Sequence, residues 1–121
     1  MVTTAQLPVN LVANEQTAIQ LLLEKLVDLL PHEVRQVILF GSKARSDFSA
    51  DSDTDILVLV NNETWDLRNF IWSLAARVEL NYDLIFNIQV IGVERWQQMR
   101  LERFSLCGNV ERDGVMLFSR S

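Results

Sequence analysis

The chain has 121 residues, a formal net charge of −5 and 49% hydrophobic residues, with a single cysteine. This length suits one domain with a sizeable core, and no apolar run approaches the ~18 residues that span a membrane. The negative net charge disfavours a nucleic-acid-binding protein, because such proteins carry a basic surface. We therefore expect one reduced cytoplasmic domain over residues 10–121, with a loose N-terminal tail over residues 1–9 and no membrane contact.

The first half of the chain predicts a helix followed by a buried strand. Apolar residues recur at helical spacing over 14–30, and Pro31 marks the end of this helix. The continuous apolar run 37–40 suits a buried strand. It ends at Gly41-Ser42, after which residues 43–45 can begin a short helix.

The middle of the chain predicts a second strand and a second long helix. Residues 55–60 form an apolar run that is typical of a strand, and Thr64 is a suitable N-cap for a helix over 65–80. We expect Trp65 and Trp72 to complete the packing of this helix, because large aromatic side chains are most often used in the core.

The last third of the chain predicts a third strand, a helix and a final short strand. The third strand covers 82–91 and is followed by a helix over 93–104. Asp113-Gly114 is a turn signal, and residues 115–118 can form the last strand. Together these elements predict an α/β (α+β) domain with a small sheet of three to four strands flanked by helices.

Two carboxylates stand directly before the second predicted strand. Asp53 and Asp55 are two residues apart, so on a strand they point to the same face. Like charges held so close repel each other, and a hard cation with oxygen ligands, such as Mg²⁺, resolves that repulsion. The alternative is a polar turn that precedes a strand, since Asp and Ser are common turn residues.

A Gly-Ser turn precedes these carboxylates at a fixed distance. The pattern Gly41-Ser42-x10-Asp53-x-Asp55 should arise by accident in roughly one chain of this length in several hundred. Gly41 lets a phosphate approach the backbone, and Ser42 can donate a hydrogen bond to it. The alternative is a simple strand-to-helix turn, and the pattern is not that of a P-loop.

The segments 41–47 and 52–58 resemble the active-site signature of the DNA polymerase beta-like nucleotidyltransferase superfamily. They are most similar to its smallest branch, the minimal nucleotidyltransferases (MNT proteins), which are often encoded beside a helical HEPN-domain partner. The resemblance is tightest over residues 38–60 and extends more loosely over most of the chain. One departure is visible, because the family usually has glycine at the position of Ser46.

The resemblance implies a compact nucleotidyltransferase fold with a mixed sheet, and an enzyme that uses Mg²⁺, with two ions expected, and ATP. Asp53 and Asp55 would bind the metal ions. The family also has a third carboxylate near the start of a neighbouring strand. Asp83 matches it and would help to activate the attacking hydroxyl, with Glu79 a weaker candidate and a solvent-facing strand-edge aspartate the alternative.

The resemblance also implies roles for four residues around the turn. Gly41 and Ser42 would hold the β- and γ-phosphates of the nucleotide. Lys43 or Arg45 would offset negative charge on the departing pyrophosphate. The alternative for both cations is an ordinary solvated side chain, since charged residues are mostly exposed.

The expected function is the transfer of AMP from ATP to a hydroxyl of a HEPN-type toxin, with this chain acting as the antitoxin. The acceptor site would be completed by that partner or by a second copy of the chain. The alternative is a catalytically silent antitoxin or regulatory module that neutralises its partner by contact, because fold alone does not prove function. Nucleic acid is not expected to be a partner.

Overall fold

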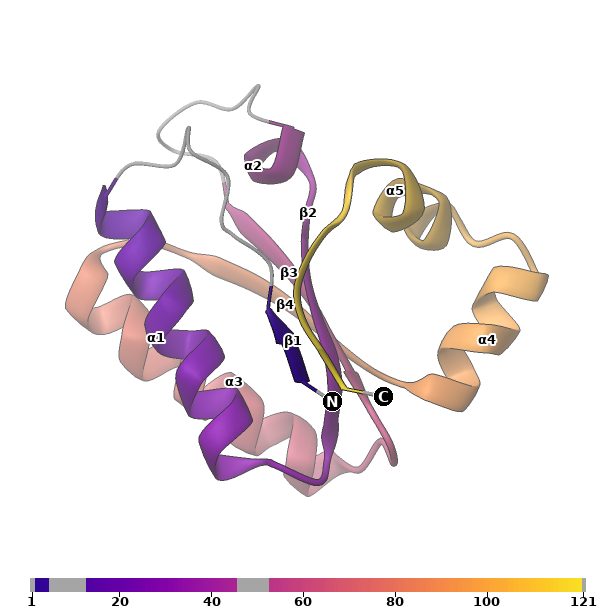
Figure 1. Ribbon diagram of the computed structural model, residues 1–121, viewed down its shortest axis with the longest axis horizontal. Coiled ribbons are helices and arrows are strands. Elements are labelled where there is room, and N and C mark those ends of the chain that lie inside the picture. Colours follow the sequence, from indigo (N-terminus) through magenta and orange to yellow (C-terminus); the bar gives the residue numbers. More distant parts are fainter. Residues whose placement is uncertain (1, 5–12, 46–52, 121) are drawn as a thin grey trace.

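The computed structural model describes residues 2–4, 13–45 and 53–120, which form three layers with a β-sheet in the middle (Figure 1). The helices are α1 (Ala13–Leu29), α2 (Ser42–Arg45), α3 (Trp65–Tyr82), α4 (Val93–Leu101) and α5 (Ser105–Asp113). The strands are β1 (Val2–Thr4), β2 (Val34–Phe40), β3 (Thr54–Val60), β4 (Phe86–Gly92) and β5 (Val115–Arg120). Within the described ranges, no helix combines the length and hydrophobicity needed to cross a bilayer.

The sheet is mixed and has the strand order β1-β5-β2-β3-β4. β3 and β4 pair in parallel, whereas β2 pairs antiparallel with both β3 and β5. The end of β2 and the beginnings of β3 and β4 therefore meet at one edge of the sheet. This topology confirms the predicted α/β class with a mixed sheet, although the sheet has five strands and not the predicted three to four. It brings the Gly-Ser turn and the two aspartates to the same edge.

Each face of the sheet has its own core. Figure 1 shows α1 and α3 on one side of the sheet and α4 and α5 on the other. Successive side chains of a strand alternate between faces, so Ile56 and Val58 join the core under α1 and α3. Leu57 and Leu59 join a smaller core with Trp96 of α4. Asp53 and Asp55 precede Leu57 by four and two residues, so the same alternation assigns them to the face covered by α4 and α5.

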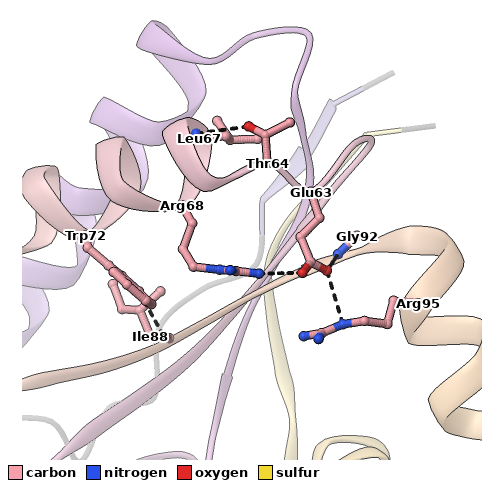
Figure 2. Close-up of polar contacts among 8 residues, drawn as sticks. All are labelled: Glu63, Thr64, Leu67, Arg68, Trp72, Ile88, Gly92 and Arg95. Carbon is pink, nitrogen blue, oxygen red and sulfur yellow. Dashed lines mark hydrogen bonds and ion pairs between the residues drawn. The ribbon is translucent and has the colours of Figure 1, made fainter.

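Several local predictions are confirmed. The first helix ends one residue before Leu30, and the second long helix begins at Trp65 as expected. Thr64 is its N-cap, because the backbone N–H of Leu67 donates to the Thr64 hydroxyl at 3.1 Å (Figure 2). β1 differs from expectation, since residues 2–4 were predicted to lie in a loose tail but pair with β5. The rest of that predicted tail lies outside the described residues.

The third predicted strand begins later than expected. The helix α3 continues to Tyr82, and Asp83 caps it in the left-handed conformation, with φ 50° and ψ 52°. The Asp83 N–H donates to the carbonyl of Glu79 at 3.0 Å. Aspartate tolerates this conformation better than most residues. β4 then covers Phe86–Gly92, so the prediction of a strand from residue 82 is wrong for its first four residues.

The predicted helix over 93–104 is two helices. α4 ends at Leu101, and the chain turns at Arg103, which has a positive φ of 60°. α5 then follows over Ser105–Asp113, where the sequence pattern predicts no helix. Six of its nine residues are polar or glycine, and its buried residues Cys107 and Val110 join the second core.

The prediction that Trp65 and Trp72 complete the core is wrong. Their exposed fractions are 67% and 43%. The Trp72 indole N–H donates to the carbonyl of Ile88 at 3.3 Å, so this ring lies over β4, an edge strand of the sheet (Figure 2). The helical spacing that placed these residues on α3 did not specify which side of the helix faces the sheet.

Glu63 joins three elements at the opposite end of the sheet from Asp55. Its carboxylate accepts from the N–H of Gly92 at 2.8 Å and from Nε of Arg95 at 3.1 Å, and it also pairs with Arg68 (Figure 2). These groups come from β4, α4 and α3 respectively. Glu63 therefore fixes where α4 leaves the sheet.

Candidate active site

Gly41 lies directly against the carboxylate of Asp55. The pairing of β2 with β3 sets Phe40 opposite Asp55, so the next residue turns over the aspartate. Gly41 has a φ of +75°, and a Cβ atom at this position would lie 2.2 Å from Oδ2 of Asp55. Only glycine combines this conformation with so close an approach. Gly41 of the Gly-Ser turn and Asp55 of the Asp-x-Asp pair, separate in the sequence, therefore lie side by side.

The Asp55 carboxylate is oriented by a neighbouring strand. Asn87 is its register partner on β4, and Asn87 Nδ2 donates to Asp55 Oδ1 at 2.8 Å. One carboxylate oxygen thus contacts the Asn87 amide while the other faces Gly41. Asp55 is half-buried and Asn87 is exposed, so the group remains accessible from outside.

Asp53 lies just before β3 and is exposed. It is two residues from Asp55, so strand alternation places both on one face of the sheet. Further along the same face, Leu57 and Leu59 are buried under α4 and α5. The two carboxylates therefore occupy the part of this face that the helices leave open.

Asp83, predicted as a third carboxylate on a strand, lies at the end of a helix. It is the exposed C-cap of α3 rather than a residue of β4. In the described part of the chain, no three His, Cys, Asp or Glu side chains gather where they could hold a metal ion. Glu79, the weaker candidate, accepts a hydrogen bond from the N–H of Phe86 at 3.2 Å. A catalytic role for Asp83 stays a prediction.

Lys43, predicted to contact the nucleotide, is buried beneath the turn. Its ammonium group lies 2.6 Å from Oε2 of Glu15 on α1, and both side chains are buried. In this position it faces α1. The side chains of Ser42 and Arg45, and Ser46 as a whole, lie outside the described part of the structure, so their predicted roles stay predictions.

The donor set suits a magnesium ion that is completed by a substrate. Mg²⁺ in phosphoryl- and nucleotidyl-transfer sites is typically held by one or two carboxylates together with substrate phosphates and water. Asp53 and Asp55 supply such carboxylates, and the Gly41 backbone lies directly beside that of Asp55. The residues that are present therefore fit this ion without a third carboxylate.

Two residues of the site region were not predicted from the sequence. Asn87 was recognised as a polar residue of the third strand, but only the strand register shows that it faces Asp55. Glu15 lies on the first helix, at a position that also suits a solvent-facing residue, and its contact with Lys43 is non-local. The alternation of polar residues at 87 and 89 was the one signal that could have drawn attention to Asn87.

Comparison with known proteins identifies the family. The family model described as "Polymerase beta, Nucleotidyltransferase" matches residues 24–121. "Putative protein adenylyltransferase MJ0604" of Methanocaldococcus jannaschii is 30% identical over 105 residues, which cover 87% of this chain and 99% of that protein. "Putative protein adenylyltransferase MJ0141" of the same organism is 38% identical over 60 residues, which cover 49% of this chain and 61% of that protein.

Solved structures share the fold at low sequence identity. A chain from the crystal structure of a toxin-antitoxin with AMP-PNP is 22% identical, with a TM-score of 0.58 over 84% of this chain and 73% of that one. A chain from the structure of a tri-AMPylated Shewanella oneidensis HEPN toxin in complex with MNT antitoxin is 24% identical, with a TM-score of 0.50 over 88% and 71%. These structures agree with the architecture found here, and the family model spans most of the chain. The protein belongs to the polymerase beta nucleotidyltransferase family.

Proposed function

We propose that this protein transfers AMP from ATP to a hydroxyl group of a partner protein in a Mg²⁺-dependent reaction, in which the hydroxyl oxygen bonds to the α-phosphorus, the hydroxyl loses its proton and pyrophosphate leaves. The observation that carries the proposal is the contact between Gly41 and Asp55, with Asp53 on the same open face. It joins a turn that a phosphate can approach to a pair of carboxylates that suit a divalent cation.

Each residue of the site has a part in this reaction. Asp53 and Asp55 would hold Mg²⁺, which would neutralise charge on the triphosphate and polarise the phosphorus under attack. Gly41 gives the phosphates access to the backbone. Asn87 keeps Asp55 in one orientation through its 2.8 Å hydrogen bond, so the carboxylate is already in place when nucleotide binds.

A protein acceptor is supported by the relatives. Both curated relatives are named as protein adenylyltransferases, and the structures that share the fold come from toxin-antitoxin complexes, one of them with an AMPylated HEPN toxin. We extend this to the present chain and propose a helical HEPN-type toxin as the acceptor, with this chain as the antitoxin.

The test is co-expression with a helical protein encoded beside this chain, followed by mass spectrometry of that partner. The proposal predicts partner molecules that carry one or more adenylyl groups with the wild type and none with Asp53→Asn/Asp55→Asn. A matched control is Asp28→Asn/Asp66→Asn, which removes two exposed carboxylates away from the site and should leave the modification intact. An unmodified partner with the wild type would contradict the proposal.

A second function is favoured by the position of Asp83. Since Asp83 does not gather with Asp53 and Asp55, a module that neutralises its partner by contact alone is the alternative. In that case the partner would co-purify with both the wild type and Asp53→Asn/Asp55→Asn, and neither would modify it.

A further inference from the structure

Lys43 and Glu15 form a buried ion pair between α2 and α1. Lys43 Nζ lies 2.6 Å from Glu15 Oε2. With Thr54, these are the buried polar or charged residues of the described part of the chain. Moving two charges out of water has a cost that their mutual attraction offsets only in part, so stability by itself does not explain a buried pair.

The ion pair links a short element to the long helix α1. α2 is a single turn of helix, and Ala44 is its apolar residue that packs against the main core. The Ala44 N–H donates to the carbonyl of Gly41 at 3.1 Å, which closes the turn on Gly41. Fixing a register or an orientation is the best-attested use of a buried polar or charged group. The Lys43–Glu15 pair is therefore suited to fixing the orientation of α2.

The same turn forms one wall of the candidate active site. Lys43 follows Gly41 by two residues, a stretch of chain that spans at most about 7 Å. On one side Gly41 approaches Asp55 so closely that a Cβ would lie 2.2 Å from Oδ2. On the other side Lys43 is held by Glu15. A shift of Lys43 therefore moves the Gly41 backbone relative to the carboxylate.

We propose that Glu15 is a positioning residue for the nucleotide site. Through Lys43 it sets the Gly41 turn against Asp55, and the affinity for a nucleoside triphosphate depends on it. This inference rests on the proposed function. It gives Lys43 a role that acts through the turn, in place of direct contact with a phosphate.

Calorimetric titration of the full chain with AMP-PNP and Mg²⁺ distinguishes these two roles. If the ion pair positions the turn, Glu15→Gln weakens binding by about 10- to 100-fold, the range found for partners that orient a binding group. Glu15→Asp keeps the charge with a shorter reach and should give an intermediate affinity. If Lys43 contacts the phosphate directly, loss of Glu15 releases it, and an unchanged or tighter affinity would overturn the proposal.

A control separates positioning from general destabilisation. Leu26→Ala removes a buried side chain roughly three turns further along α1. It should lower the thermal stability but leave the affinity of the folded protein for AMP-PNP unchanged. An equal loss of affinity in Leu26→Ala and Glu15→Gln would show that destabilisation alone explains the effect and would overturn the proposal.

The nucleotide-free protein provides a readout that does not depend on binding. In Glu15→Asp and Glu15→Gln, the backbone amide signal of Gly41 in a ¹⁵N NMR spectrum should shift, whereas in Leu26→Ala it should not. An unshifted Gly41 signal in both Glu15 variants would overturn the inference. Wild-type protein that fails to bind AMP-PNP would overturn the proposed function as well, whereas tight binding that is indifferent to Glu15 would overturn this inference alone.

Discussion

Asn87 donates a hydrogen bond of 2.8 Å to Asp55 across the parallel strands β4 and β3. The two residues are 32 positions apart in the sequence and are register partners in the sheet. Because the amide contacts one carboxylate oxygen and Gly41 approaches the other, the orientation of Asp55 is determined by its surroundings.

Replacing Asn87 with aspartate should make the site more dependent on a cation. In Asn87→Asp, a second carboxylate faces Asp55 and repels it, which we expect to lower Tm by roughly 4 °C without Mg²⁺, equivalent to about 1 kcal/mol. Added MgCl₂ should raise Tm more in this variant than in the wild type. The measurement is thermal unfolding with and without MgCl₂. Gln89→Glu, at the next exposed position of the same strand face, is the control, and an equal response in both variants would contradict the expectation.

Substitution of Gly41 should be costly for the fold. Gly41→Ala forces a left-handed conformation on a residue with a Cβ and sets that Cβ against Asp55, so we expect a loss of at least about 1–2 kcal/mol in the free energy of unfolding. Gly108→Ala is the control, because a Cβ there meets nothing within 4 Å and alanine favours the helix α5 by up to about 1 kcal/mol. Urea unfolding measures both changes, and equal stabilities of the two variants would be inconsistent with the contact.

Removing the charge of Glu63 should lower the stability of the protein and leave nucleotide binding unchanged. Glu63→Gln weakens the interactions with Gly92, Arg95 and Arg68, and we expect a loss of roughly 1–2 kcal/mol, since hydrogen bonds to charged groups are the stronger ones. The more exposed pair Arg100–Glu111 provides a comparison, with an expected loss of about 0–1 kcal/mol for Glu111→Gln. Chemical denaturation would report a larger loss for Glu63→Gln. Affinity for AMP-PNP should be unchanged in Glu63→Gln, because Glu63 lies at the opposite end of the sheet from Asp55.

The thiol of Cys107 should be unreactive in the folded protein. Burial raises the pKa of Cys107, Glu111 raises it further, and Arg100 lowers it. The thiol thus keeps its proton to higher pH in the folded state than in the unfolded one, so its contribution to stability is present below the unfolded pKa and is lost as pH rises above it. We expect slow alkylation by iodoacetamide at pH 8 and fast alkylation in urea. Equal rates in both solutions would refute burial of this group.

Local features of the fold were predictable from the sequence. Thr64 accepts a hydrogen bond from the third residue after it, and the apolar run that follows Asp55 forms β3, so short-range patterns were sufficient for both. Gly41 was identified as a point of close approach, although the group that approaches it in the structure is Asp55.

Non-local features were not predictable in the same way. The partners of Asn87 and Lys43 depend on strand register and on the packing of α1, which no short pattern specifies. The residues around Asp83 are compatible both with the end of a helix and with the start of a strand, and the sequence analysis places Asp83 on the strand. In the structure Asp83 ends the helix α3 in the left-handed conformation.

The most direct test of the account compares ATP labelled at the α-phosphate with ATP labelled at the γ-phosphate. Each is incubated with the protein, Mg²⁺ and the partner protein, and label that remains on protein after denaturation is measured. The account predicts stable label from the α-position alone, which disappears in Asp53→Asn/Asp55→Asn. Label from the γ-position, or α-label that persists in that variant, would contradict nucleotidyl transfer at the site formed by Gly41, Asp53 and Asp55.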